Sequence, residues 1–431
     1  MPHSASTTQL QHATATFRDW QLVQPLTLST GTIADVTEAQ IRVTVRVGER
    51  EATGRGSIYL SDLWAWPDPQ FSHEERVRRL RSLCHDLATH ATSVCGGEPA
   101  HPLELGLRLH AFALAGHGSE SARGIPPLAR LLCASPLDAA IHDAVGRACR
   151  CSSLALYDTL APIPSLDDRC PPEGACAAVH RLLRETPCRE FPATLVVDPR
   201  SDLQPLCAEW LGRRGYRRVK LKLTGQSPAD DAARVSEVVG VMRAHGVTHP
   251  WLSVDSNEAH PSADSVLEFL ARLARDDADA YEALQYLEQP TARDLHRAPQ
   301  DWRAVAARKP VLLDEGWVSL DDLVTARQQG WSGLALKTCK GHSLVLAAAI
   351  LARAQGLQLT LQDLTNPGRA ALHAAVLGAY LPTLNGLELN SPQFTPQANA
   401  AWLPRWQPLL DPRDGWHRFP PGPLPTGLGG E

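Results

Sequence analysis

Charged side chains stand at the ends of five successive aliphatic runs in the second half of the chain. The runs read VKLKL, LSVDSN, YLEQP, VLLDEG and LALK, and their polar residues are Lys220, Lys222, Asp255, Asn257, Glu288, Asp314, Glu315 and Lys337. Charged groups almost never enter a protein interior unpaired. Charges on five strands in a row therefore indicate a functional site at the C-terminal ends of these strands.

Three of these residues form an acidic group. Asp255, Glu288 and Asp314 follow three successive runs, so adjacent strands would bring their carboxylates together. Converging carboxylates repel one another unless a cation neutralises them. Ligation by oxygen alone suits a hard ion, with Mg²⁺ as the first choice and Mn²⁺ as the second. The alternative is that these carboxylates form structural ion pairs with the nearby lysines.

The lysines lie on the faces that point into the predicted barrel. In VKLKL the aliphatic residues share one parity, so Lys220 and Lys222 share the other, inward face. Lys222 and Lys337, on the second and sixth strands, would face each other across the cavity, and the like charge of Lys220 favours a free amine on Lys222. Two bases on opposite sides of a carbon, beside a divalent metal, suit removal of a proton α to a carboxylate through an enediolate.

The elements that must position these residues alternate between strand and helix. We predict strands at Ala193–Val197, Arg218–Leu223, Leu252–Asp255, Leu284–Glu288, Val311–Asp314, Leu334–Lys337, Leu357–Leu361 and Gly386–Leu389. We predict helices at Asp230–His245, Ser262–Arg275, Leu320–Gln329, Ser343–Gln355 and Arg369–Tyr380. This α/β alternation favours a barrel of the (β/α)8 type, with an open doubly wound sheet as the alternative.

The first 150 residues follow another pattern. Alternating residues predict a hairpin of two strands, and three helical stretches come after it. The strands are Ala39–Val47 and Ala52–Leu60, and the helices are His73–Ala91, Leu103–Ala115 and Pro136–Cys149. Strands first and helices afterwards indicate a small α+β domain.

Composition excludes several classes of protein. The 431 residues include 42 basic and 47 acidic ones, a formal charge of −5 without charge blocks. This disfavours nucleic-acid binding and polybasic attachment to a membrane. No apolar run approaches the roughly 18 residues of a membrane span, and we expect no secretion signal. The ten cysteines include no C-x-x-C pair, so we expect the reduced thiols of a cytoplasmic protein.

Taken together, these motifs resemble the enolase superfamily. The resemblance rests on K-x-K, D-x-N, E-Q-P, D-E-G and the lysine of LALKTCKG, in this order and at strand-like spacing. The pairing of K-x-K with a lysine on strand six is similar to the muconate-lactonizing-enzyme-like group of the mandelate racemase/muconate lactonizing enzyme family. The segment Ser135–Ala148 is similar to the helix that joins the capping domain of this family to its barrel.

The resemblance implies roles for the charged residues. Asp255, Glu288 and Asp314 would ligate Mg²⁺, while Lys222 and Lys337 would be the acid/base pair.

Further residues would bind the substrate. Lys220 would tune Lys222 and help to hold the substrate carboxylate, and we expect Asn257, Asp363 and Asn390 to contact the substrate.

The resemblance also implies the fold. We expect an N-terminal α+β capping domain at residues 15–150, a (β/α)7β barrel at 190–392, and a tail at 393–431 that packs back on the capping domain. Capping-domain loops near Leu26–Thr32 and Ser57–Pro67 would close over the site. Trp64 and Trp66 in the second loop form either an apolar lid or ordinary packing. Relatives are usually multimeric, so we expect a homo-oligomer.

Some positions depart from the family pattern. Glu315 is an alternative to Asp314 as the third ligand, and Lys340 begins the segment where a glycine pair is usual. Strand seven ends in QDLTNPG without a histidine, which disfavours the mandelate-racemase-like subgroup. Asn390 stands where dipeptide epimerases carry an acidic D-x-D, so a dipeptide substrate is doubtful. We interpret His342 and His373 as surface or loop histidines.

We therefore expect a Mg²⁺-dependent racemase or epimerase of a small carboxylic acid or amino-acid derivative. A dehydratase or cycloisomerase that eliminates a β-substituent is the first alternative. A non-catalytic binding protein on the same fold is the second. An unrelated metal-dependent hydrolase has little support, because histidine ligands are missing from the strand ends.

Overall fold

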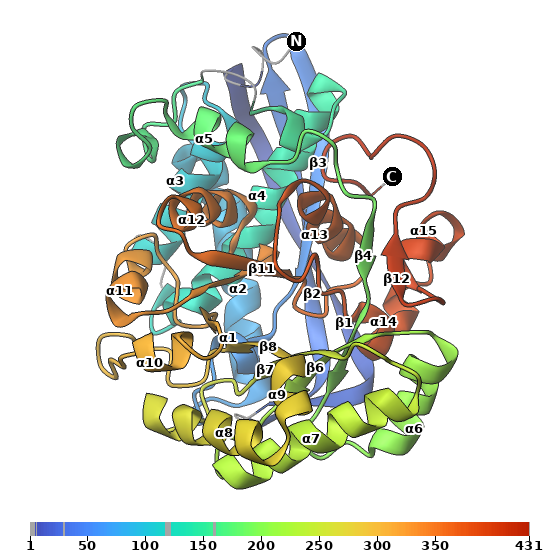
Figure 1. The fold of residues 1–431 in the computed structure, drawn as a ribbon. Coiled ribbons are helices and arrows are strands. Elements are labelled where there is room, and N and C mark those ends of the chain that lie inside the picture. The colour runs from blue at the N-terminus through green and yellow to red at the C-terminus, as the bar shows by residue number, and fades with distance from the viewer. Residues whose placement is uncertain (1–4, 6, 29–30, 117–121, 158–160, 431) are drawn as a thin grey trace.

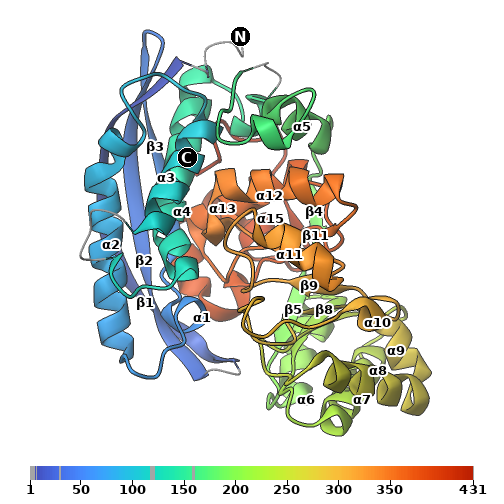
Figure 2. The ribbon, with the colours of Figure 1, turned by 90° about the vertical axis from the view of Figure 1, so that its left-hand side faces the viewer.

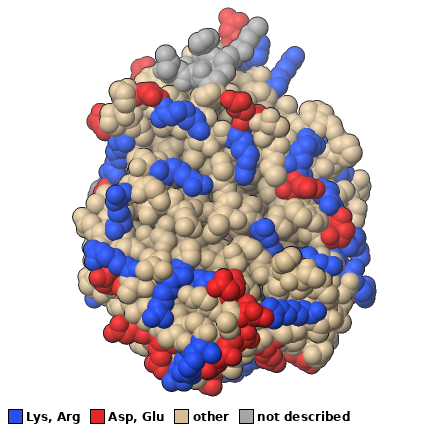
Figure 3. All heavy atoms as spheres, viewed as in Figure 1, with Lys and Arg blue, Asp and Glu red and all other residues tan. Residues whose placement is uncertain are grey.

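The computed structural model describes residues 5, 7–28, 31–116, 122–157 and 161–430. An antiparallel three-stranded sheet, with helices on one face, stands beside a curled parallel sheet of seven strands (Figures 1 and 2). On the face shown in Figure 3, basic and acidic side chains are interspersed, as the sequence without charge blocks predicts.

The three-stranded sheet has the order β1-β2-β3. Its strands are β1 (Thr8–Leu28), β2 (Gly31–Val47) and β3 (Arg50–Tyr59). The predicted hairpin is confirmed as β2 and β3, but the long strand β1 was not predicted. Its buried residues lie only near its two ends, as Leu10 and Leu26 do, and a register shift between Leu10 and His12 interrupts the alternation. The apolar signal of this strand is therefore weak.

Helices cover one face of this sheet. They are α2 (His73–Val94), α3 (Pro102–Ala115) and α4 (Pro127–Cys149), and the short α1 (Asp62–Ala65) follows β3. α4 packs on β2 and β3, and α2 packs on β1. Gly56 of β3 allows α4 to pack closely on this strand, because a Cβ at this position would lie 2.0 Å from the carbonyl oxygen of Pro136. We call this sheet with α1–α4 the cap.

The start of α4 corrects the sequence prediction. The helix begins at Pro127, nine residues before the predicted start at Pro136, which lies inside it. Proline lacks the N–H that would bond to the carbonyl one turn earlier. Here the hydroxyl of Ser135 donates to the carbonyl of Leu132 at 2.9 Å instead, so the helix continues through the proline.

The parallel sheet follows the predicted strands closely. Its strands are β5 (Thr194–Val197), β6 (Arg218–Lys222), β7 (Trp251–Asp255), β8 (Leu284–Glu288), β9 (Val311–Leu313), β10 (Gly333–Lys337) and β11 (Gln358–Gln362). Each strand pairs with the next in chain order. Alternation is confirmed, because Val219 and Leu221 are buried in the core that includes α7, while Lys220 and Lys222 lie on the other face.

Helices connect these strands on the outside. They are α6 (Leu203–Cys207), which continues as a π-helical turn at Ala208–Arg213, α7 (Pro228–Ala244), α8 (Ala263–Asp276), α9 (Ala278–Ala283), α10 (Arg303–Ala306), α11 (Asp322–Gln329), α12 (His342–Ala354) and α13 (Gly368–Tyr380). The five predicted helices are confirmed within three residues at each end.

The eighth predicted strand is corrected. Residues 386–389 form no strand, and the only ladder contact seen there is a single bridge between Glu388 and Gln362 of β11. No strand pairing joins β11 to β5 among the described residues. The side-chain amide of Gln393 stands there, accepting from the N–H of Val196 at 3.0 Å and donating to its carbonyl at 2.7 Å. The side chain of Gln393 thus provides hydrogen-bond partners for the backbone N–H and carbonyl of Val196 at the edge of β5.

The remaining elements surround the sheet. They are α5 (Ala175–Leu182), β4 (Glu190–Pro192), α14 (Ser391–Phe394), α15 (Leu403–Leu410), β12 (Trp416–Arg418) and short 3₁₀ turns at Ser153–Ala155, Asp167–Arg169, Thr338–Lys340 and Pro396–Asn399. The tail returns toward the cap: α14 contacts β1, and Phe394 joins the apolar core of the cap.

A buried polar cluster joins the cap to the parallel sheet's helices. Asp138 of α4 accepts from the hydroxyl and the N–H of Ser343 on α12, both at 2.7 Å, and pairs with His110 at 2.9 Å. His342 and His373, predicted on the surface, are buried on α12 and α13. Burial lowers the pKa of His342 to about 4, so this side chain is neutral at pH 7.

Six of the ten cysteines are buried, and no disulfide is seen among the described residues. None of the helices that the structure describes has the length and apolar character needed to span a membrane.

Replacing Gln393 tests how β5 is held. We expect Gln393→Ala to lower the free energy of unfolding by about 2–4 kcal/mol, because it leaves two buried backbone groups of Val196 unpaired. Urea unfolding followed by circular dichroism measures this change. Gln397→Ala is the matched control, because Gln397 is an exposed tail residue, and it should change stability by about 0.5 kcal/mol or less. Equal effects of the two substitutions would contradict the assigned role.

Candidate active site

The predicted charged residues meet at the C-terminal ends of β6 to β10. The strand register places Lys222 beside Asp255 and Asp255 beside Glu288 in one row across three strands. Asp314 follows β9 directly, and Lys337 is the last residue of β10. All of these side chains are buried, so each charge must find a partner within the protein.

Lysine ammonium groups lie between the carboxylates. Lys220 Nζ is 2.9 and 3.0 Å from the two oxygens of Glu288 and 3.1 Å from Asp255 Oδ2. Lys222 Nζ is 2.6 Å from Asp255 Oδ2, and Lys337 pairs with Asp314 and lies 3.4 Å from Glu288. The result is a chain of alternating charges that runs around the strand ends.

This chain favours the protonated form of Lys220 and Lys337. Burial opposes the charged form of Lys220, but Glu288, Glu388 and Asp255 outweigh it and raise the pKa of the ammonium well above its ordinary value. Lys337 behaves alike, because Asp314 and Glu288 outweigh burial and raise its pKa. In this arrangement both groups carry protons, so each is in the acid form of a general acid/base residue.

The carboxylates suit a hard cation in type and position. They are oxygen donors on adjacent strands, and Asp314 Oδ1 and Glu315 Oε2 are buried without a hydrogen-bond partner. Within the described ranges, however, no three acidic, histidine or cysteine side chains lie close enough together to share one ion. The lysines occupy the space between them, so the ion pairs named as an alternative from the sequence are present. The residues fit Mg²⁺ if Lys220 and Lys337 give up part of these contacts.

Glu315 points to a different role from Asp314. Its Oε1 accepts from the indole N–H of Trp64 at 2.8 Å and from the amide of Asn257 at 3.0 Å. Trp64 lies on α1, so this contact ties the cap to the strand ends. The ammonium of Lys337 lies 4.9 Å from the centre of the Trp64 ring. Trp64 thus lines the pocket and is held to Glu315 by a hydrogen bond that we call the latch.

Lys340 is a residue that sequence reasoning did not place in the site. It is fully buried, donates to the carbonyl of Trp317 at 3.1 Å, and lies 3.5 Å from Asp314 Oδ1. Burial lowers its pKa to about 8, against the opposing effect of Asp314. Lys340 follows the strand-six lysine at a point where the family pattern has glycine. This departure could have indicated that Lys340 belongs to the site.

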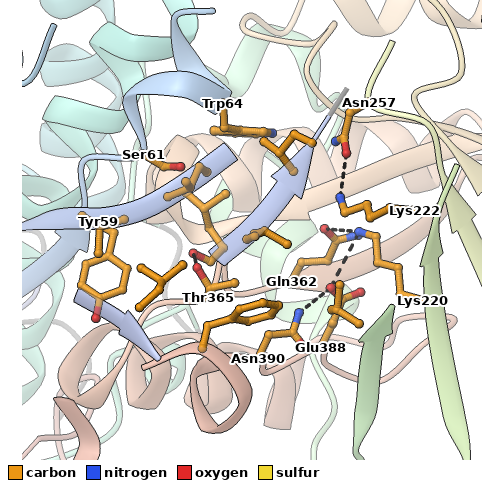
Figure 4. A pocket seen from close by; sticks show the side chains of 18 of the residues that line it. Tyr59, Ser61, Trp64, Lys220, Lys222, Asn257, Gln362, Thr365, Glu388 and Asn390 are labelled. Atoms are coloured by element: carbon orange, nitrogen blue, oxygen red, sulfur yellow. Dashed lines mark hydrogen bonds and ion pairs between the residues drawn. The ribbon is translucent and has the colours of Figure 1, made fainter. Parts of the chain in front are cut away.

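A pocket opens over this charged floor. Figure 4 shows Lys220, Lys222 and Asn257 at one side and Tyr59 and Trp64 of the cap at the other. Its apolar wall comes mainly from the cap and consists of Leu22, Leu26, Leu28, Ile33, Val36, Tyr59 and Trp64, with Val196, Leu364 and Phe394. The loop predicted near residues 26–32 contributes Leu26 and Leu28, and its residues 29 and 30 lie outside the described residues.

Gln362 and Glu388 line the same pocket and were not predicted. The Gln362 amide donates to Glu288 at 2.5 Å and accepts from Lys220 at 3.2 Å. Glu388 lies 3.7 Å from Lys220 and accepts from the amide of Asn390 at 2.7 Å (Figure 4). Glu388 is two residues before Asn390, so both side chains point to the same, inward side. This spacing could have predicted that Glu388 lines the pocket.

The predicted substrate-binding residues divide into two groups. Asn257 and Asn390 line the pocket. Asp363 is not among the described lining residues, and its carboxylate accepts from the backbone N–H groups of Thr365 at 2.8 Å and Asn390 at 3.3 Å. Burial raises the pKa of this carboxyl well above its usual value.

A double-mutant cycle tests the latch. We expect Trp64→Phe and Glu315→Ala to be coupled by about 1–3 kcal/mol in the free energy of unfolding, because each removes one partner of a hydrogen bond to a buried carboxylate. Trp66→Phe replaces Trp64→Phe in the control cycle, since Trp66 is also buried but packs on Phe71. Chemical denaturation measures both cycles, and equal coupling in the two would argue against the latch.

Solved structures share this architecture. An enolase from Bradyrhizobium complexed with magnesium and mandelic acid is 19% identical, over 99% of this chain and 96% of that one, with a TM-score of 0.63. A muconate lactonizing enzyme from Pseudomonas fluorescens complexed with muconolactone is 18% identical, over 98% and 96%, with a TM-score of 0.64. A dipeptide epimerase from Enterococcus faecalis V583 complexed with Mg and L-Leu-L-Tyr is 14% identical, over 98% and 99%, with a TM-score of 0.63.

At these identities the structures establish a shared fold. A search of curated proteins found no match. A family model described as enolase C-terminal domain-like matches residues 202–430, which is more than half of the chain. This match spans β6 to β11 and every charged residue of the site. The chain therefore belongs to the enolase superfamily, in its mandelate racemase/muconate lactonizing enzyme group.

Proposed function

We propose that this protein removes a proton from the carbon α to a carboxylate and returns one to the opposite face, as a racemase or epimerase. One observation carries the proposal: Lys222 and Lys337, from strands with three others between them, line one pocket beside three buried carboxylates. Two amines on separate walls can address the two faces of one carbon.

Asp255, Glu288 and Asp314 would hold a Mg²⁺ ion. When bound, the ion supplies positive charge that stabilises an enediolate. Two of the similar structures were solved as complexes with magnesium. Asp314 suits the third position better than Glu315, because both Trp64 and Asn257 donate to Glu315 Oε1.

The lysines divide the proton transfers between them. Lys222 and Lys337 each hold or accept a proton on one side of the substrate, and Lys220 holds the substrate carboxylate. Each lysine acts as the base for one enantiomer and as the acid for the other, so the pair exchanges roles between the two directions of the reaction.

The pocket wall supports a small acid with an apolar substituent. Leu26, Leu28, Ile33 and Trp64 face the charged floor from the cap and exclude water from it. A charged substituent would lose its hydration against these side chains. Among the described lining residues Glu388 is the one carboxylate, and it can receive a positive group, so an amino-acid derivative also fits.

Two alternative functions are also compatible with the site. Elimination by a dehydratase or cycloisomerase needs one base and a leaving group, and either lysine could serve. A non-catalytic binding protein would need no metal, and each of the three carboxylates already has a lysine partner.

Hydrogen exchange at the substrate tests the assignment of the lysines. In D₂O with Mg²⁺, we expect α-substituted acids with apolar side chains to exchange the α-proton, as measured by NMR. Lys222→Ala should abolish exchange from one enantiomer and Lys337→Ala from the other, because each removes the base on one face. Lys309→Ala is the control, since Lys309 stacks on Tyr281 away from the pocket lining. Wild-type exchange in both lysine variants would reject the assignment.

Metal binding distinguishes the enzyme from the non-catalytic alternative. We expect calorimetry to show binding of Mg²⁺ or Mn²⁺ to the wild type, weakened about tenfold or more in Asp255→Asn, because one charged ligand becomes neutral. Asp276→Asn, a substitution at an exposed ion pair with Arg275, should bind like the wild type. Absence of any metal signal in the wild type would favour the binding protein.

A further inference from the structure

A second hollow lies on the outer face of the cap sheet, outside the active site. It runs between β1–β3 and the segments around residues 367–369 and 397–402. Figure 1 shows α13 and α14 beside these strands, and α14 contacts β1 while α13 contacts β3. We call it the arginine groove, because Arg18, Arg42, Arg55 and Arg369 line it.

Two of these arginines stand directly opposite each other. The register of β2 and β3 pairs Arg42 with Arg55, and both side chains are exposed. Like charges at directly opposed positions destabilise a sheet. Four residues further along the same strand, Arg46 is opposite Glu51, which is the expected arrangement for stability. The sheet thus bears an uncompensated repulsion only at the groove end of this pair of strands.

Counter-charge is scarce in the groove. Glu38 is the one carboxylate among the described lining residues, and it already accepts from the Trp20 indole at 3.0 Å and the Gln40 amide at 3.1 Å. Neither guanidinium of Arg42 and Arg55 has a hydrogen bond or ion pair to the described part of the chain. The guanidinium groups of Arg42 and Arg55 can therefore each donate two parallel hydrogen bonds to a ligand.

A second, independent feature points to a ligand. Ser57 lines the groove, is only 4% exposed, and its hydroxyl has no hydrogen-bond partner. It follows Arg55 at the next position on the same face of β3. Other buried hydroxyls of the described chain also have no partner, but this one lines the groove and can donate to an oxygen of a bound anion.

The aromatic walls complete the site. Arg18 lies 3.8 Å from the ring centre of Trp20, and Arg369 lies 5.2 Å from that of Trp402. Stacking on Trp20 holds the guanidinium of Arg18 flat, so that its edge can donate to a ligand. Both rings line the groove from opposite sides.

We infer that the arginine groove binds a small polyanion that carries phosphate or carboxylate groups. The paired forks of Arg42 and Arg55 match two oxygens of one anionic group, and Ser57 donates to the same group. Arg18 receives a second anionic group at the Trp20 end. Binding relieves the repulsion between the two opposed arginines, so the occupied groove is more stable than the empty one.

Calorimetry and thermal unfolding at low ionic strength test this inference. With EDTA present, inorganic pyrophosphate and citrate serve as probes of the two chemistries. We expect at least one of them to bind the wild type and to raise its unfolding temperature. Arg42→Gln and Arg55→Gln should each weaken binding about tenfold or more, the size of one charge-assisted contact. Arg42→Lys should bind with intermediate affinity, because it keeps the charge and loses the fork.

The unfolding temperature without anion gives a second readout. Arg42→Gln should be more stable than the wild type, because the substitution removes the repulsion, while Arg46→Gln should be no more stable. If Arg42→Gln and Arg55→Gln bind the probes like the wild type, the anions occupy another site and the inference is wrong. Lack of any response of the wild type to both probes would also overturn it.

Discussion

The structure depends on a buried chain of opposite charges at the ends of five parallel strands. Removing ions from water costs several kcal/mol each, and their mutual attraction repays this only with good geometry. Here Lys220, Lys222 and Lys337 alternate with carboxylates at hydrogen-bonding distances. A protein that needed only stability could place apolar side chains there at no loss. We therefore interpret the carboxylates as a site at which a metal ion can replace part of the contacts to the lysine ammonium groups.

The cap and the strand ends are built as one unit around these charges. Trp64 reaches from the cap to Glu315, and Asn366 accepts from the N–H of Tyr59 at 2.6 Å. Behind the site, Asp138 holds Ser343 at the start of α12. These contacts place the apolar wall over the charged floor. In the proposed function, the apolar side chains of the cap select the substituent of the substrate, and the charged residues at the strand ends carry out the proton transfers.

Much of the charged floor could be predicted from the sequence. A strand has a strict period of two, so the parity of Lys222 and Asp255 follows from their aliphatic neighbours. Parallel strands in chain order then bring their ends together, as the register of Asp255 and Glu288 confirms. The match of the family model to residues 202–430 confirms the recognition of the superfamily.

Other features depend on tertiary contacts that no local pattern records. Gln362 is a neutral amide, and only its place between Lys220 and Glu288 makes it part of the site. The eighth predicted strand fails because Gln393 takes its place against β5. The middle of strand β1 is exposed or half-buried and the strand has a register shift, so no regular apolar alternation marks it in the sequence. The ion pairs themselves were one of two alternatives, and parity cannot choose between a lysine and a metal as the partner.

A crystal structure of the protein grown with Mg²⁺ tests the central claim most directly. The account predicts one ion with oxygens of Asp255, Glu288 and Asp314 at about 2.1 Å, and with the ammonium groups of Lys220 and Lys337 withdrawn from between them. An empty site, with both lysines still bridging the carboxylates at saturating Mg²⁺, would contradict it.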